Sequence, residues 1–126
     1  ECVMTEKEHN ITILKIEPHK EPEVISIPDT LHNLQNLVQG HLEAISLSST
    51  ACIIVNEEGK LLGLKANRRF QNDVLAGNIL IVGRSGSEIV SLTAEQIKQY
   101  TEQFKYPETI SVEEVRAASK YHVITF

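Results

Sequence analysis

Apolar residues recur along this chain with two periods, one typical of strands and one typical of helices. Alternating or uninterrupted apolar runs of about four to eight residues indicate strands. Eight segments show that pattern: residues 11–16, 23–27, 42–47, 51–56, 60–64, 78–82, 88–92 and 121–126. In the first, Ile11 and Ile13 share one face and Leu14 and Ile16 the other. The run 78–82 is almost wholly apolar, so we expect a central strand there.

Leucines recur every three residues from Leu31 to Leu37, which is helical spacing. Asp29 precedes them as a candidate N-cap, and Gly40 follows where a helix commonly stops. The spacing therefore predicts a short amphipathic helix over residues 30–39.

Two more helices are predicted by capping boxes, in which a hydroxyl and a Glu or Gln side chain each satisfy a free backbone amide. The first box is Thr93-Ala-Glu-Gln96, and its helix should run to about Phe104. The second is Ser111-Val-Glu-Glu114, and its helix should run to about Ser119, before the strand at 121–126.

Hairpin connections predominate among the predicted strands. Glu57-Glu-Gly59 predicts a turn with Gly59 at positive φ, which would pair residues 60–64 with residues 51–56. Strands joined by hairpins form antiparallel sheets, so the fold class is α+β: a mostly antiparallel sheet with two or three short helices packed on one face. A chain of 126 residues forms one domain of this kind.

We divide that domain into three stretches. Residues 1–10 are polar and expected to be flexible, and Met4 is a candidate natural start. Residues 11–104 form the α+β core. Residues 105–126 are a C-terminal helix and strand that extend the same domain.

Net charge and the lengths of the apolar runs make some classes of binding partner unlikely. The formal net charge is −5, which makes duplex DNA an unlikely partner because domains that bind it are usually strongly basic. No apolar run approaches the roughly 18 residues of a membrane-spanning helix. The two cysteines, Cys2 and Cys52, form no disulfide framework, so we expect a cytoplasmic protein without a membrane.

The sequence lacks the residue patterns that metal sites, nucleotide-triphosphate loops and reactive cysteines require. The five histidines include no pair spaced to share one helical face, and no Cys-x-x-Cys is present, so no metal is expected. Gly83-Arg-Ser-Gly86 lacks the Lys-Ser/Thr of a nucleotide-triphosphate loop. Cys52 lies in an apolar run that disfavours a reactive thiolate. We therefore expect no catalytic residue and no cofactor.

A basic segment, residues 60–84, remains. It holds five basic residues against Asp73 alone, a net charge of +4 in 25 residues of an acidic chain, and such a cluster is a candidate anion site. The candidate ligand- or partner-binding residues, with Asn67 to Phe70 expected in a loop, are Lys65, Asn67, Arg68, Arg69, Phe70 and Arg84. The alternative is a loop with two solvated arginines, one paired with Asp73, and with Phe70 in the core.

Four blocks of sequence resemble a known family. They are Ile13-Leu-Lys-Ile-Glu-Pro18, Asn56-Glu-Glu-Gly-Lys-Leu-Leu-Gly-Leu64, Asn67-Arg68-Arg69 and Asp73-Val-Leu-Ala-Gly-Asn-Ile-Leu-Ile-Val-Gly83. Together with Leu92-Thr-x-Glu-Gln96, they are similar to domain-of-unknown-function family 3846, over about residues 11–104. The resemblance implies a setting in phages and mobile elements, whose small proteins often bind and inhibit host defence proteins or sequester signalling nucleotides.

Three functional hypotheses follow. The first is a non-enzymatic phage or mobile-element binding protein that counteracts host defence through the 65–73 segment. Its partner would be a host defence protein or an anionic nucleotide messenger. The second is a nucleic-acid-associated accessory protein, and the third is a small enzyme of unknown reaction. A terminal strand at 121–126 with apolar residues on both faces favours a homo-oligomer.

Overall fold

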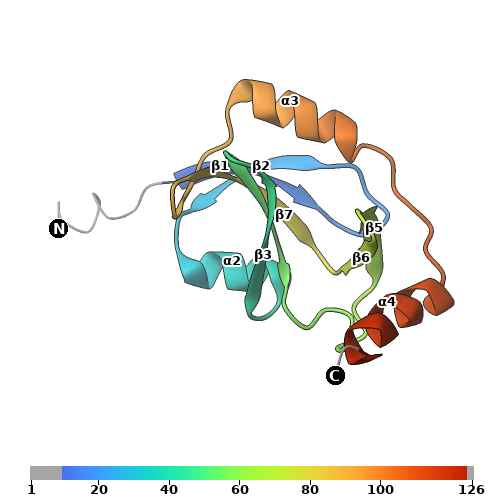
Figure 1. Cartoon of the computed structure of the whole chain (residues 1–126). Helices are drawn as coiled ribbons and strands as arrows, with labels where there is room; N and C mark the ends of the chain where they lie inside the picture. Colours follow the sequence, from blue (N-terminus) through green and yellow to red (C-terminus); the bar gives the residue numbers. More distant parts are fainter. Residues whose placement is uncertain (1–9, 125–126) are drawn as a thin grey trace.

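The computed structural model describes residues 10–124, and side-chain burial as far as residue 118. A six-stranded sheet forms its centre, with strands in the order β2-β1-β7-β4-β3 and with β8 also paired to β7 (Figure 1). Its strands are β1 (Asn10–Ile16), β2 (Glu23–Pro28), β3 (Leu42–Ser48), β4 (Ala51–Asn56), β7 (Ile79–Ser85) and β8 (Glu88–Val90). Every pair is antiparallel, and β7 lies at the centre between β1 and β4, as the run at 78–82 predicts.

Both faces of this sheet are buried. On one face Leu14, Ile16, Ile53, Ile79 and Ile81 pack against Tyr100 and Phe104. On the other face Ile11, Ile13, Ile54, Leu80 and Val82 pack against Leu34 and Val38. The predicted division of residues 11–16 between two faces is therefore correct, and burial on both faces explains the continuous apolar run of β7.

The α+β class is confirmed, but the helices do not share one face. Helix α2 (Leu31–Val38) and helix α3 (Ala94–Gln103) lie on opposite faces of the sheet (Figure 1). The physical reason is that β1, β4 and β7 carry apolar side chains on both sides, and each side needs a cover.

Side chains next to the first turn cap the N-terminal ends of α2 and α3. Thr93 accepts a hydrogen bond from the Gln96 amide, and the Gln96 side chain accepts one from the Thr93 amide, so the first capping box is present. Thr30, rather than Asp29, caps α2 by accepting from the Asn33 amide at 3.2 Å. At the C-terminal end of α2, Gln39 takes the left-handed conformation, one residue before Gly40.

Residues 60–64 do not form the predicted strand. Residues 57–63 form successive turns, in which the Leu62 amide donates to the Glu58 carbonyl at 2.9 Å. Gly63, at φ 75°, takes the left-handed conformation expected of Gly59. Strands β3 and β7 already occupy both edges of β4, so no place remains beside it for residues 60–64.

The predicted loop at Asn67–Phe70 is instead a strand. Strands β5 (Ala66–Phe70) and β6 (Asp73–Ala76) form a separate antiparallel hairpin, and Gln71 in its turn has φ 56°. The register shifts between Ala66 and Arg68, which lets two successive polar side chains, Asn67 and Arg68, both face inward.

The predicted C-terminal strand is also wrong within the described chain. Helix α4 runs over Val112–Ile124, so residues 121–124 are helical; residues 125–126 lie outside the described residues. A helix offers no strand edge, so the reason for expecting a homo-oligomer is removed. The expected flexibility of residues 1–10 concerns residues outside the description, except Asn10, which begins β1. Among the described residues, no helix is long and apolar enough to cross a membrane.

Candidate binding groove

Arg68, the centre of the predicted anion site, is buried, with 1% of its surface exposed. Its guanidinium donates to the Lys20 carbonyl at 2.7 Å, the Phe104 carbonyl at 2.9 Å and the Asn67 Oδ1 at 2.8 Å. Burial lowers the pKa of Arg68, and the negative charge of Glu108 acts in the opposite direction. Arg68 thus ties the hairpin to the turn after β1 and to the end of α3.

Asn67 is fully buried beside it. Its Nδ2 donates to the carbonyls of Ile16 and Gly77, each at 2.8 Å. Together the two side chains join segments that are far apart in the sequence. In this structure they hold the fold together.

Arg69 points outward and meets α4 and the segment before it. Its guanidinium is 2.8 Å from a Glu108 carboxylate oxygen and 2.7 Å from one of Glu114. Hydrogen bonds to Glu114 and then to Glu108 raise the pKa of Arg69, and Arg69 in turn lowers the pKa of Glu114. Glu114 is thereby diverted from the predicted second capping box, of which only the Ser111 hydroxyl bond to the Glu114 amide is observed.

The remaining predicted residues do not form one site: Phe70 faces the core, and Lys65 and Arg84 lie near opposite ends of β7. Phe70 packs on Phe104 with ring centroids 6.4 Å apart, as its core interpretation predicts. Lys65 is exposed beside the start of β7, whereas Arg84 is exposed near the far end of that strand. At about 3.3 Å per residue, these ends are roughly 20 Å apart. Ligand binding by the six residues stays a prediction.

Carboxylates form ion pairs with part of the basic segment. Asp73 pairs with Lys60 rather than with an arginine, and Glu108 and Glu114 pair with Arg69. Two of the five basic side chains of the segment, Lys60 and Arg69, are thus paired with carboxylates in the folded chain.

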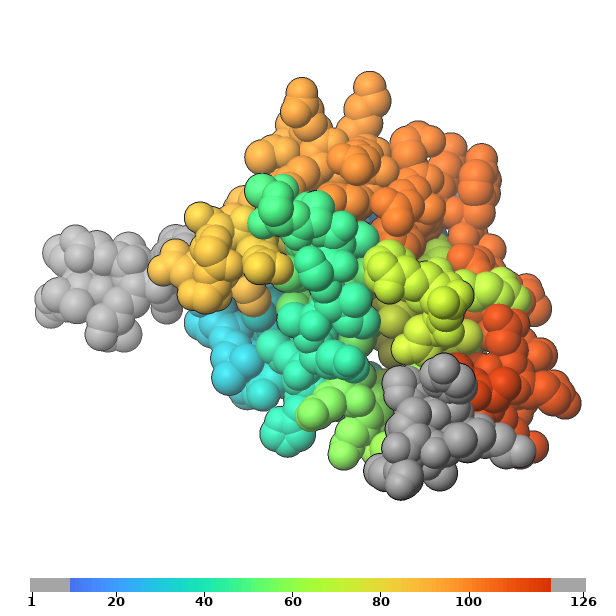
Figure 2. Space-filling model, viewed as in Figure 1, coloured from blue at the N-terminus to red at the C-terminus, as the bar shows by residue number. Residues whose placement is uncertain are grey.

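A groove lies next to this hairpin, between β3 and β6, with the turn at residues 57–61 closing one end. Figure 2 shows β3 and the β5–β6 hairpin side by side on one face of the molecule. The hollow encloses about 470 Å³. Ile45, Val55 and Leu75 are among its apolar lining residues.

Asn56 fixes the turn that closes the groove. Its Nδ2 donates to the carbonyls of Val38 and Gln39, at the end of α2, and its Oδ1 accepts from the Glu58 amide at 2.7 Å. Gly59 then approaches β6 so closely that an added Cβ would lie 2.9 Å from the Ala76 carbonyl oxygen. The salt bridge between Lys60 and Asp73 joins the turn to β6 on the other side.

The turn carries two exposed leucines next to the groove. Leu61 is 79% exposed and Leu62 is 58% exposed. Scattered exposed leucines are ordinary, but two adjacent ones on a hydrogen-bonded turn, with a partly apolar groove beside them, form a candidate contact surface. We name the groove lining together with Leu61 and Leu62 the β3–β6 groove.

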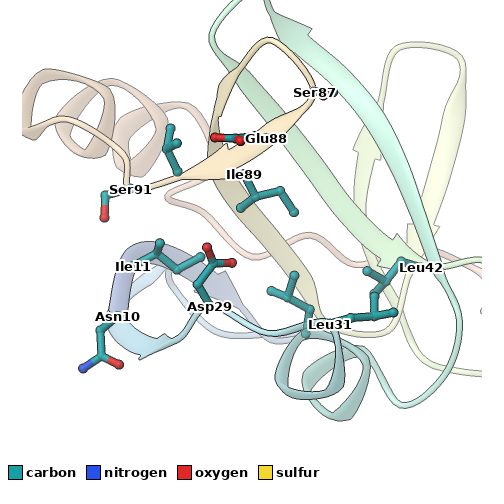
Figure 3. Close-up of a pocket in the computed structure, with 11 residues that line it drawn as sticks. Asn10, Ile11, Asp29, Leu31, Leu42, Ser87, Glu88, Ile89 and Ser91 are labelled. Carbon is teal, nitrogen blue, oxygen red and sulfur yellow. The ribbon is translucent and has the colours of Figure 1, made fainter. Parts of the chain in front are cut away.

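A second hollow, of about 590 Å³, lies between β8 and the start of α2 (Figure 3). Ile89 of β8 and Leu31 of α2 both line it, and the carboxyl groups of Asp29 and Glu88 lie on its border. Its described lining contains no Lys, Arg or His, so this hollow does not fit an anionic ligand.

No group of three or more His, Cys, Asp or Glu residues that could hold a metal ion occurs among residues 10–124. In the described part of the chain, the pKa of two carboxyl groups, Glu17 and Glu114, is clearly displaced, and basic neighbours lower it in both cases. Those shifts keep the carboxylates ionised, which suits ion pairing.

Comparison with known families gives one match. The family described as Domain of unknown function (DUF3846) matches residues 11–105. The chain belongs to this family. No curated protein and no solved structure matches the chain.

The DUF3846 match covers the sheet from Ile11 onward, the hairpin and both walls of the β3–β6 groove. It ends at residue 105, so Glu108, Glu114 and α4 lie outside it. Arg69 of the DUF3846 region is thus held by carboxylates from outside that region.

Sequence reasoning missed the β3–β6 groove because Lys60 to Leu64 has the composition of a strand. The available signal was its pair of flanking glycines. Gly59 and Gly63 are four residues apart around Leu61-Leu62, a spacing that suits consecutive turns better than a strand.

Proposed function

We propose that this DUF3846 protein is a non-enzymatic binding protein whose partner is another protein, held at the β3–β6 groove. The observation that supports it most directly is the groove itself, a hollow of about 470 Å³ with both apolar and charged lining residues, next to two exposed leucines on a hydrogen-bonded turn. Exposed apolar surface beside a polar rim is typical of protein-binding sites.

A protein partner suits the geometry better than the anionic nucleotide that the sequence leaves open. The Arg69 guanidinium already meets two carboxylates, and the Arg68 guanidinium is buried against carbonyls. An anion would have to displace these partners before it gained any contact. The phage or mobile-element setting implied by the family resemblance makes a host defence protein the first partner to test.

The leucines alone do not suffice. Complete burial of one leucine contributes about 1.5–3 kcal/mol, so the pair offers at most about 6 kcal/mol. A micromolar complex needs about 8 kcal/mol. The groove lining and the edge of the sheet must supply the remainder.

The test compares tagged wild-type protein with a variant carrying Leu61→Asp and Leu62→Asp, and with the control Val112→Asp, which places an aspartate at an exposed apolar position outside the groove. Both leucines and Val112 are exposed, so all three proteins should fold alike by circular dichroism. We expect a protein that co-purifies with wild type and control to be reduced at least tenfold with the leucine variant. Equal recovery with all three would refute the assignment of the groove.

A thermal-shift screen of nucleotides provides the competing result. A ligand that binds only the folded state raises the melting temperature, because it stabilises that state by RT ln(1 + L/Kd), where L is the free ligand concentration. A nucleotide-induced rise that Arg69→Ala abolishes would favour the anionic-ligand hypothesis over this one.

A further inference from the structure

Strand β3 has one unpaired edge within the described chain, because β4 is its only partner there. The Glu57 amide donates to the carbonyl of His41, the residue next to β3, at 2.8 Å. Hydrogen-bonded pairs alternate along an antiparallel ladder, so Glu43 and Ile45 also direct their backbone groups to β4. The amides and carbonyls of Leu42, Ala44 and Ser46 therefore point away from β4, toward the open edge of the sheet.

The two outer strands of the sheet differ in how well they are protected. Strand β2 is bounded by Pro22 and ends at Pro28, and proline blocks the addition of a further strand. Strand β3 contains no proline, and its register is regular from Leu42 to Ser46, before the irregularity at Ser48. That stretch can accept an added strand of about five residues.

The charge beside this edge has one sign. Glu43, Glu57 and Glu58 line the groove and are exposed, while the lining lysine, Lys60, is engaged with Asp73. A strand added to β3 would place alternate side chains over the groove, beside Glu43 and the glutamates of the turn. Basic side chains at those places complement the charge, and a second copy of β3 would instead bring Glu43 towards its own equivalent.

We infer that the β3–β6 groove takes an extended segment of a partner protein, which adds to β3 as an antiparallel or parallel strand and presents Lys or Arg to Glu43, Glu57 and Glu58. This inference rests on the proposed function, because it names the partner's chemistry at the same groove. Main-chain hydrogen bonds would supply affinity, and alternate side chains would supply selectivity.

The probes are three synthetic peptides of about seven residues: alternating Lys and Val, alternating Glu and Val, and the Lys-Val peptide with its central Val replaced by Pro. We expect the Lys-Val peptide to bind at least about tenfold more tightly than either of the others, because one lacks the charge and the other lacks a strand amide. Equal binding of the Lys-Val peptide and its proline version would show simple charge attraction and would overturn strand addition.

Two variants locate the peptide. Glu43→Lys reverses the charge, and Ala44→Pro removes an outward amide without breaking the ladder to β4; Ala44→Ser is the matched control. Each of the first two should weaken binding of the Lys-Val peptide about tenfold or more, whereas Ala44→Ser should retain it. Retention by both Glu43→Lys and Ala44→Pro would overturn the inference.

Amide hydrogen exchange of wild type gives a readout that does not depend on how the variants fold. The peptide should protect the amides of Leu42, Ala44 and Ser46, in that alternating pattern. If the peptide leaves the exchange rates of these three amides unchanged, strand addition is contradicted. If the protein sediments as a dimer without peptide, a second copy of the chain is the occupant of the β3 edge. Loss of partner binding in the leucine variant but not in Ala44→Pro would leave the proposed function standing while refuting this inference.

Discussion

Replacing Arg68 by Met should destabilise the fold severely, although arginine is usually a surface residue. The methionine stem fills much of the same space but carries no donor. The carbonyls of Lys20 and Phe104 and the Asn67 Oδ1 would each lose a hydrogen bond shorter than 3.0 Å. These acceptors belong to three different segments, so the loss would loosen the hairpin, the turn after β1 and the end of α3 together.

The size of the effect follows from those three bonds. A buried acceptor left without a donor costs about 1–3 kcal/mol, which gives roughly 2–6 kcal/mol for the Phe104 carbonyl and the Asn67 Oδ1 together. The part-buried bond to the Lys20 carbonyl adds about 0.5–1.5 kcal/mol. Removal of a buried charge offsets part of this, as it does when buried ionic groups are replaced by apolar ones. We therefore expect a net loss of about 3–5 kcal/mol, a large fraction of the roughly 5–15 kcal/mol that stabilises an ordinary domain.

The measurement is urea unfolding followed by far-ultraviolet circular dichroism, because the chain has no tryptophan to report by fluorescence. Arg84→Met is the matched control, since Arg84 is exposed, and it should change stability by less than about 0.5 kcal/mol. A loss below about 1 kcal/mol for Arg68→Met, with an unchanged denaturant slope, would refute the structural role. It would also restore Arg68 as a candidate ligand-binding residue.

Three further outcomes are expected. Gly83→Ala should destabilise the fold far more than Gly86→Ala in the same unfolding assay, because an added Cβ at Gly83 would lie 2.4 Å from a backbone oxygen. Gly86, at φ 62°, has open space around it, so its substitution costs only conformational strain of about 1–2 kcal/mol. Equal losses of stability in the two variants would contradict the close contact at Gly83. Asn67→Ala and Arg68→Met should be non-additive by about 0.5–3 kcal/mol in a double-mutant cycle, because their side chains share a 2.8 Å hydrogen bond, and additivity would show independent roles. Glu114→Gln should remove an acid-dependent part of stability: the folded-state pKa lies below the ordinary 4.5, so the contribution of Glu114 is present above that pH and is lost as pH falls through the folded value. The melting temperatures of wild type and Glu114→Gln, measured from pH 7 to pH 3, should therefore differ at neutral pH and converge at the acid end. A constant difference across this range would contradict the ion pair.

The basic segment shows why a charge pattern along the sequence misleads. Lys60, Arg68 and Arg69 lie within ten residues of one another, but only Lys60 has its carboxylate partner, Asp73, in the same segment. Arg68 donates to Phe104, 36 residues later, and to Lys20, 48 residues earlier. Arg69 meets Glu108 and Glu114, 39 and 45 residues later. No local pattern carries those distances.

The sequence by itself determined the features that depend on neighbours within a few residues. The capping box at Thr93, the leucine spacing of α2 and the two-sided burial of β1 and β7 follow from backbone hydrogen bonding and side-chain period alone. The α+β class follows in turn, because short hairpin connections dictate antiparallel pairing.

Only the tertiary structure decided what depends on competition for space. Residues 60–64 have the composition of a strand, but β3 and β7 occupy both edges of β4, so the segment becomes a turn that exposes two leucines beside a groove. Asn67 and Arg68 have the composition of a loop, but distant carbonyls satisfy their donors and make burial possible. The physical reason is the same in both cases: a side chain or strand edge takes its final state from partners that the chain supplies only after it has folded.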